Sequence, residues 1–174
     1  MIRKLLSMAA VGWLGVVPAS ADLAPLPLKV EGKIVGTGLE TGGKKEKQVQ
    51  EKKLRIELTT LSSKDPGPLQ VTCIFYARDL KSDKVVVEKE LNLAATLSGG
   101  RASLETPVEE FKSNQQHYLG GGTKPNGKPK TNVKKVEASG HEYAGWGIRV
   151  YGQNHVLIGK AYSADHLDPE NSKQ

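Results

Sequence analysis

Apolar and polar residues alternate along most of the chain with a period of two. The clearest case is the stretch 54–61, where Leu54, Ile56 and Leu58 fall on one side and Arg55 and Glu57 on the other. Alternation of this kind predicts β-strands with one buried and one solvent-facing side. The same pattern occurs in the stretches 28–36, 69–77, 84–93, 101–107, 143–152 and 155–163.

Residues typical of turns separate these stretches. Gly, Pro, Asp, Asn and Ser cluster at 62–68, 81–83, 98–100 and 151–154, and such clusters favour tight turns between strands. Short strands joined in this way predict an all-β protein, a single antiparallel β-sandwich of about seven to eight strands. We expect one domain over residues 22–165, because no repeat or second boundary interrupts it.

Two segments depart from the alternation. Residues 42–53 contain good helix formers but a single apolar residue, Val49, so they favour a solvated loop or a strand extension as much as a helix. Residues 107–119 are compatible with one or two helical turns that begin at Pro107 and point Phe111 inward. Helix therefore contributes little to the predicted fold.

The strand expected at 143–152 contains the only tryptophan that follows residue 21, flanked by Gly145 and Gly147. Glycine weakens strands, so this pair indicates a bulge or the close approach of a bulky ring, and it gives Trp146 room to pack across the sheet. A core role is favoured over a sugar-stacking platform because the indole shares its side with Ala144, Ile148 and Val150.

The opposite side of the same strand carries Tyr143, Arg149 and Tyr151. These three side chains are the candidates for an exposed binding strip. The alternative is that Tyr–Arg–Tyr stabilises a solvent-facing sheet surface by cross-strand packing.

The two ends of the chain differ from the middle. Arg3 and Lys4 precede an uncharged apolar stretch at 5–17, and Ala19 and Ala21 form the small-residue pattern of a cleavage site. This order predicts a signal peptide at 1–21, too short to remain as a membrane span, and therefore export to the periplasm or the extracellular space. Residues 166–174 are polar and predict a flexible C-terminal tail.

Charge adds a second candidate surface. The formal net charge of +6 falls by two when the signal peptide is removed, so the mature chain is mildly basic. Lys124, Lys128 and Lys130 form a basic cluster that could attract an anionic envelope glycan. Nucleic acid is not an expected partner, because no aromatic residues are interleaved to stack on bases.

The same cluster lies in a stretch that approaches a phosphate-binding loop, Gly122 to Pro129, "GTKPNGKP". A phosphate-binding loop needs converging backbone N–H groups and a Ser or Thr hydroxyl for magnesium. Pro129 occupies the hydroxyl position, and Pro125 removes a further N–H. The stretch is interpreted as a surface loop without a nucleotide.

Catalytic and metal-binding patterns are weak. The single cysteine, Cys73, alternates onto an apolar side and is interpreted as a small buried hydrophobe rather than a nucleophile or an intermolecular disulfide. Residues 163–168 crowd a serine, a histidine and two aspartates into one short stretch, which favours a turn over a catalytic triad. No metal, cofactor or catalytic residue is predicted. The remaining histidines are dispersed: His117, His141 and His155.

The order of strands over residues 28–163 resembles that of immunoglobulin-like or fibronectin type III-like sandwiches. The stretch "SGHEYAGW" resembles their tyrosine corner, with Tyr143 in the position of the corner tyrosine and Gly145 where immunoglobulin domains carry their second cysteine. The pattern is also similar to that of small exported bacterial proteins. The cysteine pair is absent, and the tryptophan falls in a late strand.

Three functions remain open at this point. The first is a non-catalytic binding or structural module of the cell envelope that contacts a protein or an anionic glycan. The second is a secreted hydrolase or metal-dependent enzyme that uses scattered histidines and carboxylates. The third is a subunit of a surface assembly.

Overall fold

The computed structural model describes residues 28–41, 47–60, 62, 65–120 and 133–171. The predicted signal peptide, the glycine–lysine stretch 122–129 and the lysines Lys124, Lys128 and Lys130 lie outside these ranges. The strands are β1 (Leu28–Thr41), β2 (Lys47–Thr60), β3 (Leu69–Asp79), β4 (Lys84–Ala95), β5 (Arg101–Glu105), β6 (Glu109–Asn114), β7 (His117–Leu119), β8 (Lys134–Val136), β9 (Ser139–Tyr151) and β10 (Leu157–Tyr162).

The described part of the chain is all-β, as the alternation predicts. Its helical segments are two single 3-10 turns, η1 (Gln153–His155) and η2 (Asp165–Leu167). The helical turn expected after Pro107 is wrong, because residues 109–114 and 117–119 form β6 and β7. Phe111 nevertheless points inward as expected and is buried, since strand alternation also turns it to the core.

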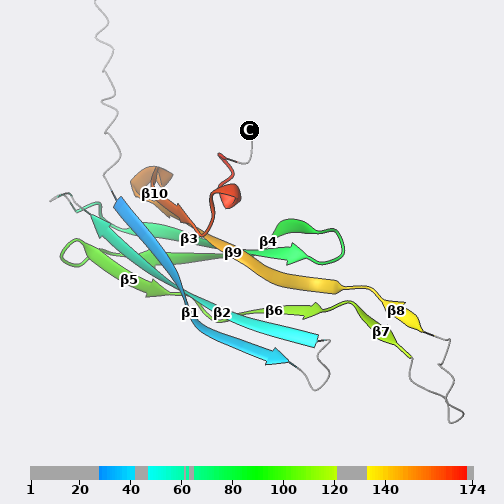
Figure 1. Ribbon diagram of the computed structural model, residues 1–174. Coiled ribbons are helices and arrows are strands. Elements are labelled where there is room, and N and C mark those ends of the chain that lie inside the picture. The colour runs from blue at the N-terminus through cyan, green and yellow to red at the C-terminus, as the bar shows by residue number, and fades with distance from the viewer. Residues whose placement is uncertain (1–27, 42–46, 61, 63–64, 121–132, 172–174) are drawn as a thin grey trace, which may run out of the picture.

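All strand pairs are antiparallel, and eight strands are connected in one hydrogen-bonded sheet (Figure 1). On one side β2 pairs with β1, and on its other side it pairs with both β5 and β6. Likewise β9 pairs with β3 on one side and with β6 and β10 on the other, while β4 pairs with β3. Strands β7 and β8 form a separate ribbon that extends from one end of the molecule.

One buried cluster lies between the two groups of strands, β1–β2–β5–β6 and β3–β4–β9–β10. Strand β2 contributes Leu54, Ile56 and Leu58, which are fully buried, while the polar residues between them are exposed. Strand β6 of the same group adds Phe111, and strands β3 and β9 contribute the opposing side chains, among them Val71, Cys73, Phe75, Trp146, Ile148 and Val150. Burial of these apolar side chains is the main force that holds the strands together.

Cys73 belongs to this cluster and is a free, fully buried thiol. Burial raises the pKa of the thiol to about 12, because the thiolate would lose its hydration. The thiol is therefore protonated and inaccessible in the folded protein.

Trp146 packs on the core side of the sheet. The room for its indole does not come from the neighbouring glycines, Gly145 and Gly147. A Cβ on Gly32 of β1 would lie 2.5 Å from Cη2 of Trp146, so the indole lies against the bare backbone of β1. Gly145 and Gly147 face the other way, because side chains alternate along β9. A Cβ on Gly147 would lie 2.6 Å from Cε1 of Tyr162, so this glycine accommodates a tyrosine ring on the opposite face.

A bulge in β9 changes the predicted sides of two residues. Tyr76 pairs with Gly145 and Ala77 pairs with Tyr143, which leaves Ala144 as an extra residue. Ala144 consequently packs on the outer side of the sheet, and Tyr143 packs against the core. The expectation that Tyr143 shares an exposed side with Arg149 is therefore wrong.

Candidate binding site on the outer face of β3 and β9

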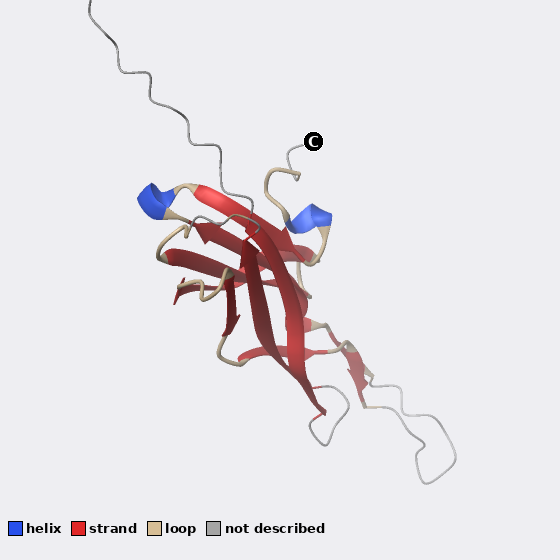
Figure 2. Ribbon diagram, turned by 90° about the vertical axis from the view of Figure 1, so that its left-hand side faces the viewer, coloured by secondary structure: helices blue, strands red, loops and turns tan. Residues whose placement is uncertain are grey.

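The side of β3, β4 and β9 that points away from the core is called the outer face. Ile74 and Tyr76 of β3 are buried there in a second apolar cluster with Leu167. This cluster exists because residues 164–171, here called the C-terminal strap, fold back over the sheet (Figures 1 and 2). The face predicted to be solvent-exposed is thus partly covered by the end of the described chain.

The strap is fixed by three kinds of contact. Leu167 is buried, and its carbonyl oxygen accepts a hydrogen bond from the Tyr76 hydroxyl at 3.2 Å. Asp168 is also buried and forms a 2.8 Å ion pair with Lys160 of β10. The backbone N–H of Trp146 donates to Oγ of Ser163 at 2.9 Å just before the strap begins. The packed chain therefore continues beyond the boundary expected at residue 165.

Charges within the strap and β10 stabilise one another. The Lys160 ammonium holds the pKa of Asp168 below its usual value near 3.8, and the two carboxylates of Asp168 and Glu170 raise the pKa of Lys160. The crowded stretch 163–168 thus forms a turn, as its sequence favours, and its Asp168 also supplies an ion pair that holds the strap, where a flexible tail was expected from residue 166 onward.

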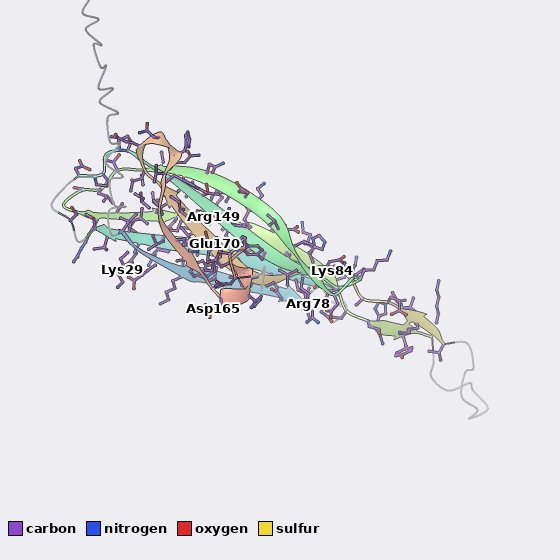
Figure 3. All side chains as sticks on the ribbon, turned by 90° about the horizontal axis from the view of Figure 1, so that it is seen from above. Lys29, Arg78, Lys84, Arg149, Asp165 and Glu170 are labelled. Carbon is purple, nitrogen blue, oxygen red and sulfur yellow. The ribbon has the colours of Figure 1, made fainter. Side chains whose placement is uncertain are left out.

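Arg149 lies at the centre of the outer face (Figure 3). Its Nε–H donates to the Tyr162 hydroxyl at 2.8 Å, and Tyr151 lies close enough to act on its pKa. These two hydroxyl groups raise the pKa of Arg149, so the guanidinium is permanently charged. Among the residues that the structure describes, no carboxylate lies within ion-pair distance of this guanidinium.

Two grooves meet at Arg149. The first, here called the valine groove, has a volume of about 330 Å³ and runs between β4 and the strap; its walls include Ile74, Val85, Val87, Glu90 and Leu167. The second, here called the lysine groove, has a volume of about 230 Å³ and includes Tyr151, Leu157, Lys160 and Tyr162. Arg149 and Pro169 line both grooves, so one cation is accessible from either side of the strap.

The structure brings together two of the three residues of the predicted binding strip, and its role in binding stays a prediction. Arg149 and Tyr151 lie together on the outer face, whereas Tyr143 contacts Phe111 in the core with ring centroids 5.4 Å apart. Burial raises the pKa of Tyr143 to about 12. The strip's other members, Tyr76, Lys160 and Tyr162, were not found from the sequence, because strand register decides which residues of β3 and β10 stand beside Arg149.

The described ranges contain no group of three or more His, Cys, Asp or Glu residues placed to hold a metal ion. His141 contacts Glu88, and His117 contacts the carbonyl oxygen of Gln115 at 2.9 Å. Within those ranges, too, no helix has the length and apolar character needed to cross a membrane.

No protein-family model and no curated protein matches the chain. This chain is similar to a protein from Akkermansia muciniphila whose crystal structure is known. The match covers 79% of this chain and 71% of that chain, with 9% sequence identity and a TM-score of 0.24. A TM-score this low supports no conclusion about the fold or the function of this chain.

Proposed function

We propose that the protein is an exported, non-catalytic binding module of the cell envelope, and that Arg149 on the outer face is its contact with an anionic group. One observation carries this proposal. A guanidinium whose Nε–H is held by the Tyr162 hydroxyl, and which forms no ion pair with a carboxylate in the described part of the chain, lines two grooves at once.

The chemistry of the guanidinium supports an anionic partner. Arginine has five N–H donors in a planar fork that matches a carboxylate. Tyr162 fixes the side chain while using one of these donors. An arginine already immobilised by packing loses little side-chain entropy when a ligand binds, so the site is preorganised.

The fold supports a module built on a rigid scaffold. Two groups of strands contribute to one core, as expected of a β-sandwich of the immunoglobulin-like or fibronectin type III-like class. One departure from the simplest sandwich is that β6 pairs with both β2 and β9, which joins the two groups along one edge. Export rests on the signal-peptide pattern of residues 1–21.

The test is capture of envelope components by the purified chain from residue 22 onward. The wild-type chain and Arg149→Gln are compared at low and raised salt, with Arg101→Gln as the control. Arg101 is an exposed arginine on β5, so the control removes the same charge at a distance from the outer face.

We expect Arg149→Gln to weaken capture at least about tenfold, because a charge-assisted hydrogen bond contributes about 1.5–3 kcal/mol. Raised salt should weaken wild-type capture, since ions screen an accessible guanidinium. Equal capture by the wild-type chain and Arg149→Gln would overturn the proposal.

A further inference from the structure

The C-terminal strap shows which chemistry the outer face accepts. Leu167 fills an apolar pocket against Ile74 and Tyr76. The next residue, Asp168, points its carboxylate to Lys160, and the charge of Arg149 further lowers the pKa of this carboxyl group. An aliphatic side chain followed by a carboxylate is thus already bound here, in the same chain.

The valine groove offers a second place for the same pair of groups. Val85 and Val87 of β4 are 45% and 57% exposed, which is high for large aliphatic side chains on a sheet beside a groove. They face Leu167 and Pro169 of the strap, with Ile74 among the residues that line the groove. An aliphatic side chain placed between these walls would remove apolar surface from water on both sides.

Arg149 supplies the complementary charge. It lines the valine groove together with Glu90 but forms no ion pair with it, and within the described residues its Nε–H donates to the Tyr162 hydroxyl. The strap carboxylate of Asp168 is paired with Lys160 instead. The guanidinium is therefore available to a carboxylate that arrives in the groove.

The lining of the groove decides between a peptide and a sugar. Sugar rings are bound by exposed aromatic faces, but the aromatic side chain that lines this groove, Tyr76, is only 7% exposed. Tyr162 lies with its ring against Gly147, and Tyr143 is on the opposite side of the sheet, half-buried against the core with Lys52 over its ring. Aliphatic walls without an open aromatic platform favour an aliphatic peptide side chain.

We propose that the valine groove binds a peptide segment of a partner protein in which an aliphatic residue stands next to an aspartate or glutamate. The aliphatic side chain lies between Val87 and Leu167, and the carboxylate pairs with Arg149. This inference rests on the proposed function and names the partner's chemistry.

The test uses the isotope-labelled chain from residue 22 onward and four probes, followed by titration in NMR spectra. The first probe is the blocked peptide acetyl-Ala-Leu-Asp-Ala-amide, and the second replaces its Asp by Asn. The third replaces its Leu by Ser, and the fourth is a short oligomer of galacturonic acid. We expect the first peptide to shift the amide signals of Tyr76, Val87 and Arg149, and each altered peptide to bind at least about fivefold more weakly.

Two variants distinguish a loss of binding in the valine groove from a general effect of removing an exposed valine. Val87→Ser should weaken binding of the first peptide about fivefold, whereas Val108→Ser should leave this binding unchanged. Val108 is 54% exposed and lies before β6, so it matches Val87 in exposure but not in place. Both substitutions are at exposed positions, and unchanged melting temperatures would show that the fold is retained.

Each outcome is decisive. Equal binding of the Asp and Asn peptides, or binding of the galacturonate oligomer without the peptide, would overturn this inference. Capture of envelope material that depends on Arg149 would still support the proposed function in either case. If Arg149→Gln leaves both capture and peptide binding unchanged, the proposed function fails as well.

Discussion

Thr106 and Ser113 are both buried hydroxyl residues, and they differ in their hydrogen bonds. The Thr106 hydroxyl accepts from the backbone N–H of Leu54 at 3.0 Å and donates to the carbonyl oxygen of Pro107 at 2.8 Å. The hydroxyl of Ser113 is buried and has no hydrogen-bond partner among the residues that the structure describes. A buried polar atom without a partner costs free energy, so the two hydroxyls have opposite effects on stability.

We therefore expect opposite results from removing each hydroxyl. Thr106→Val leaves the N–H of Leu54 unpaired and should lower the free energy of unfolding by about 1–3 kcal/mol. Ser113→Ala should leave it unchanged or raise it by up to about 1 kcal/mol. Urea unfolding of both variants checks this, and a Ser113→Ala variant as unstable as Thr106→Val would contradict it.

The charge state of Asp168 controls the strap. The pKa of Asp168 is lower in the folded protein than its ordinary value near 3.8. Its carboxylate therefore stabilises the fold fully when the pH is above that ordinary value, and this contribution is lost as the pH falls through the pKa of the folded state. Asp168→Asn removes the effect at any pH.

At neutral pH we expect Asp168→Asn to speed hydrogen exchange at the Leu167 amide, and the difference from the wild type should vanish in acid. Hydrogen-exchange mass spectrometry over the strap measures this. Glu170→Gln is the matched control, because Glu170 contacts the same lysine from a side chain that is 70% exposed. An equal effect of both substitutions would refute a specific role for the Asp168 ion pair.

At the scale of elements, β1 and β9 approach each other closely across the core. The backbone of Gly32 lies against the Trp146 indole, and a Cβ there would also be 2.7 Å from Cδ1 of Ile148. Both neighbours belong to the buried core and have no free space to move into. This contact determines how near β1 can lie to the opposite strands.

Gly32→Ala should lower the free energy of unfolding by about 1–3 kcal/mol through overpacking. Gly38 provides the control within the same strand, because a Cβ there meets only the side chain of Glu51, at 3.0 Å. Thermal unfolding of both alanine variants measures the difference. A Gly32→Ala protein as stable as Gly38→Ala would show that β1 can shift away from the indole.

The sequence allowed the strands to be predicted but not their irregularities. Period-two alternation found the second half of β2, β3 and the second half of β9, since nothing in those segments interrupts the pattern. The glycine pair around Trp146 indicated a bulge, yet the residue left unpaired is Ala144, and this is settled by the partner strand. The side occupied by Tyr143 could therefore not be read from β9 alone.

The sequence predicted only the part of the candidate site that lies on a single strand, β9. Arg149 and Tyr151 were expected on one exposed side, and they do lie together there. The grooves beside them depend on Val87, Tyr162 and Leu167, which come from three other segments. Leu167 is one apolar residue in a polar stretch, so its sequence context predicts a flexible tail rather than a buried anchor.

At the scale of the whole molecule, β6 joins the two groups of strands. It pairs with β2 over six residues and with β9 over two. Phe111 reinforces this junction, because its ring lies 6.2 Å from that of Phe75 and 5.4 Å from that of Tyr143. One side chain thus connects three strands at the point where the sheet passes from one group to the other.

Phe111→Ala should lower the free energy of unfolding by about 3–5 kcal/mol, the usual cost of a large cavity in a core. Phe111→Leu retains most of the volume and should cost much less. Denaturant unfolding gives both values. A small loss for Phe111→Ala would mean that the junction is held by its hydrogen bonds alone.

The position of the strap in the chain has a consequence for biosynthesis. Ribosomes add residues from the N-terminus onward, and the strap follows every strand of the sheet. The wall formed by Leu167 and Pro169 is therefore the last part of the groove to leave the ribosome. A partner can therefore meet the finished groove only after residue 169 has been synthesised and the strap has folded onto the sheet.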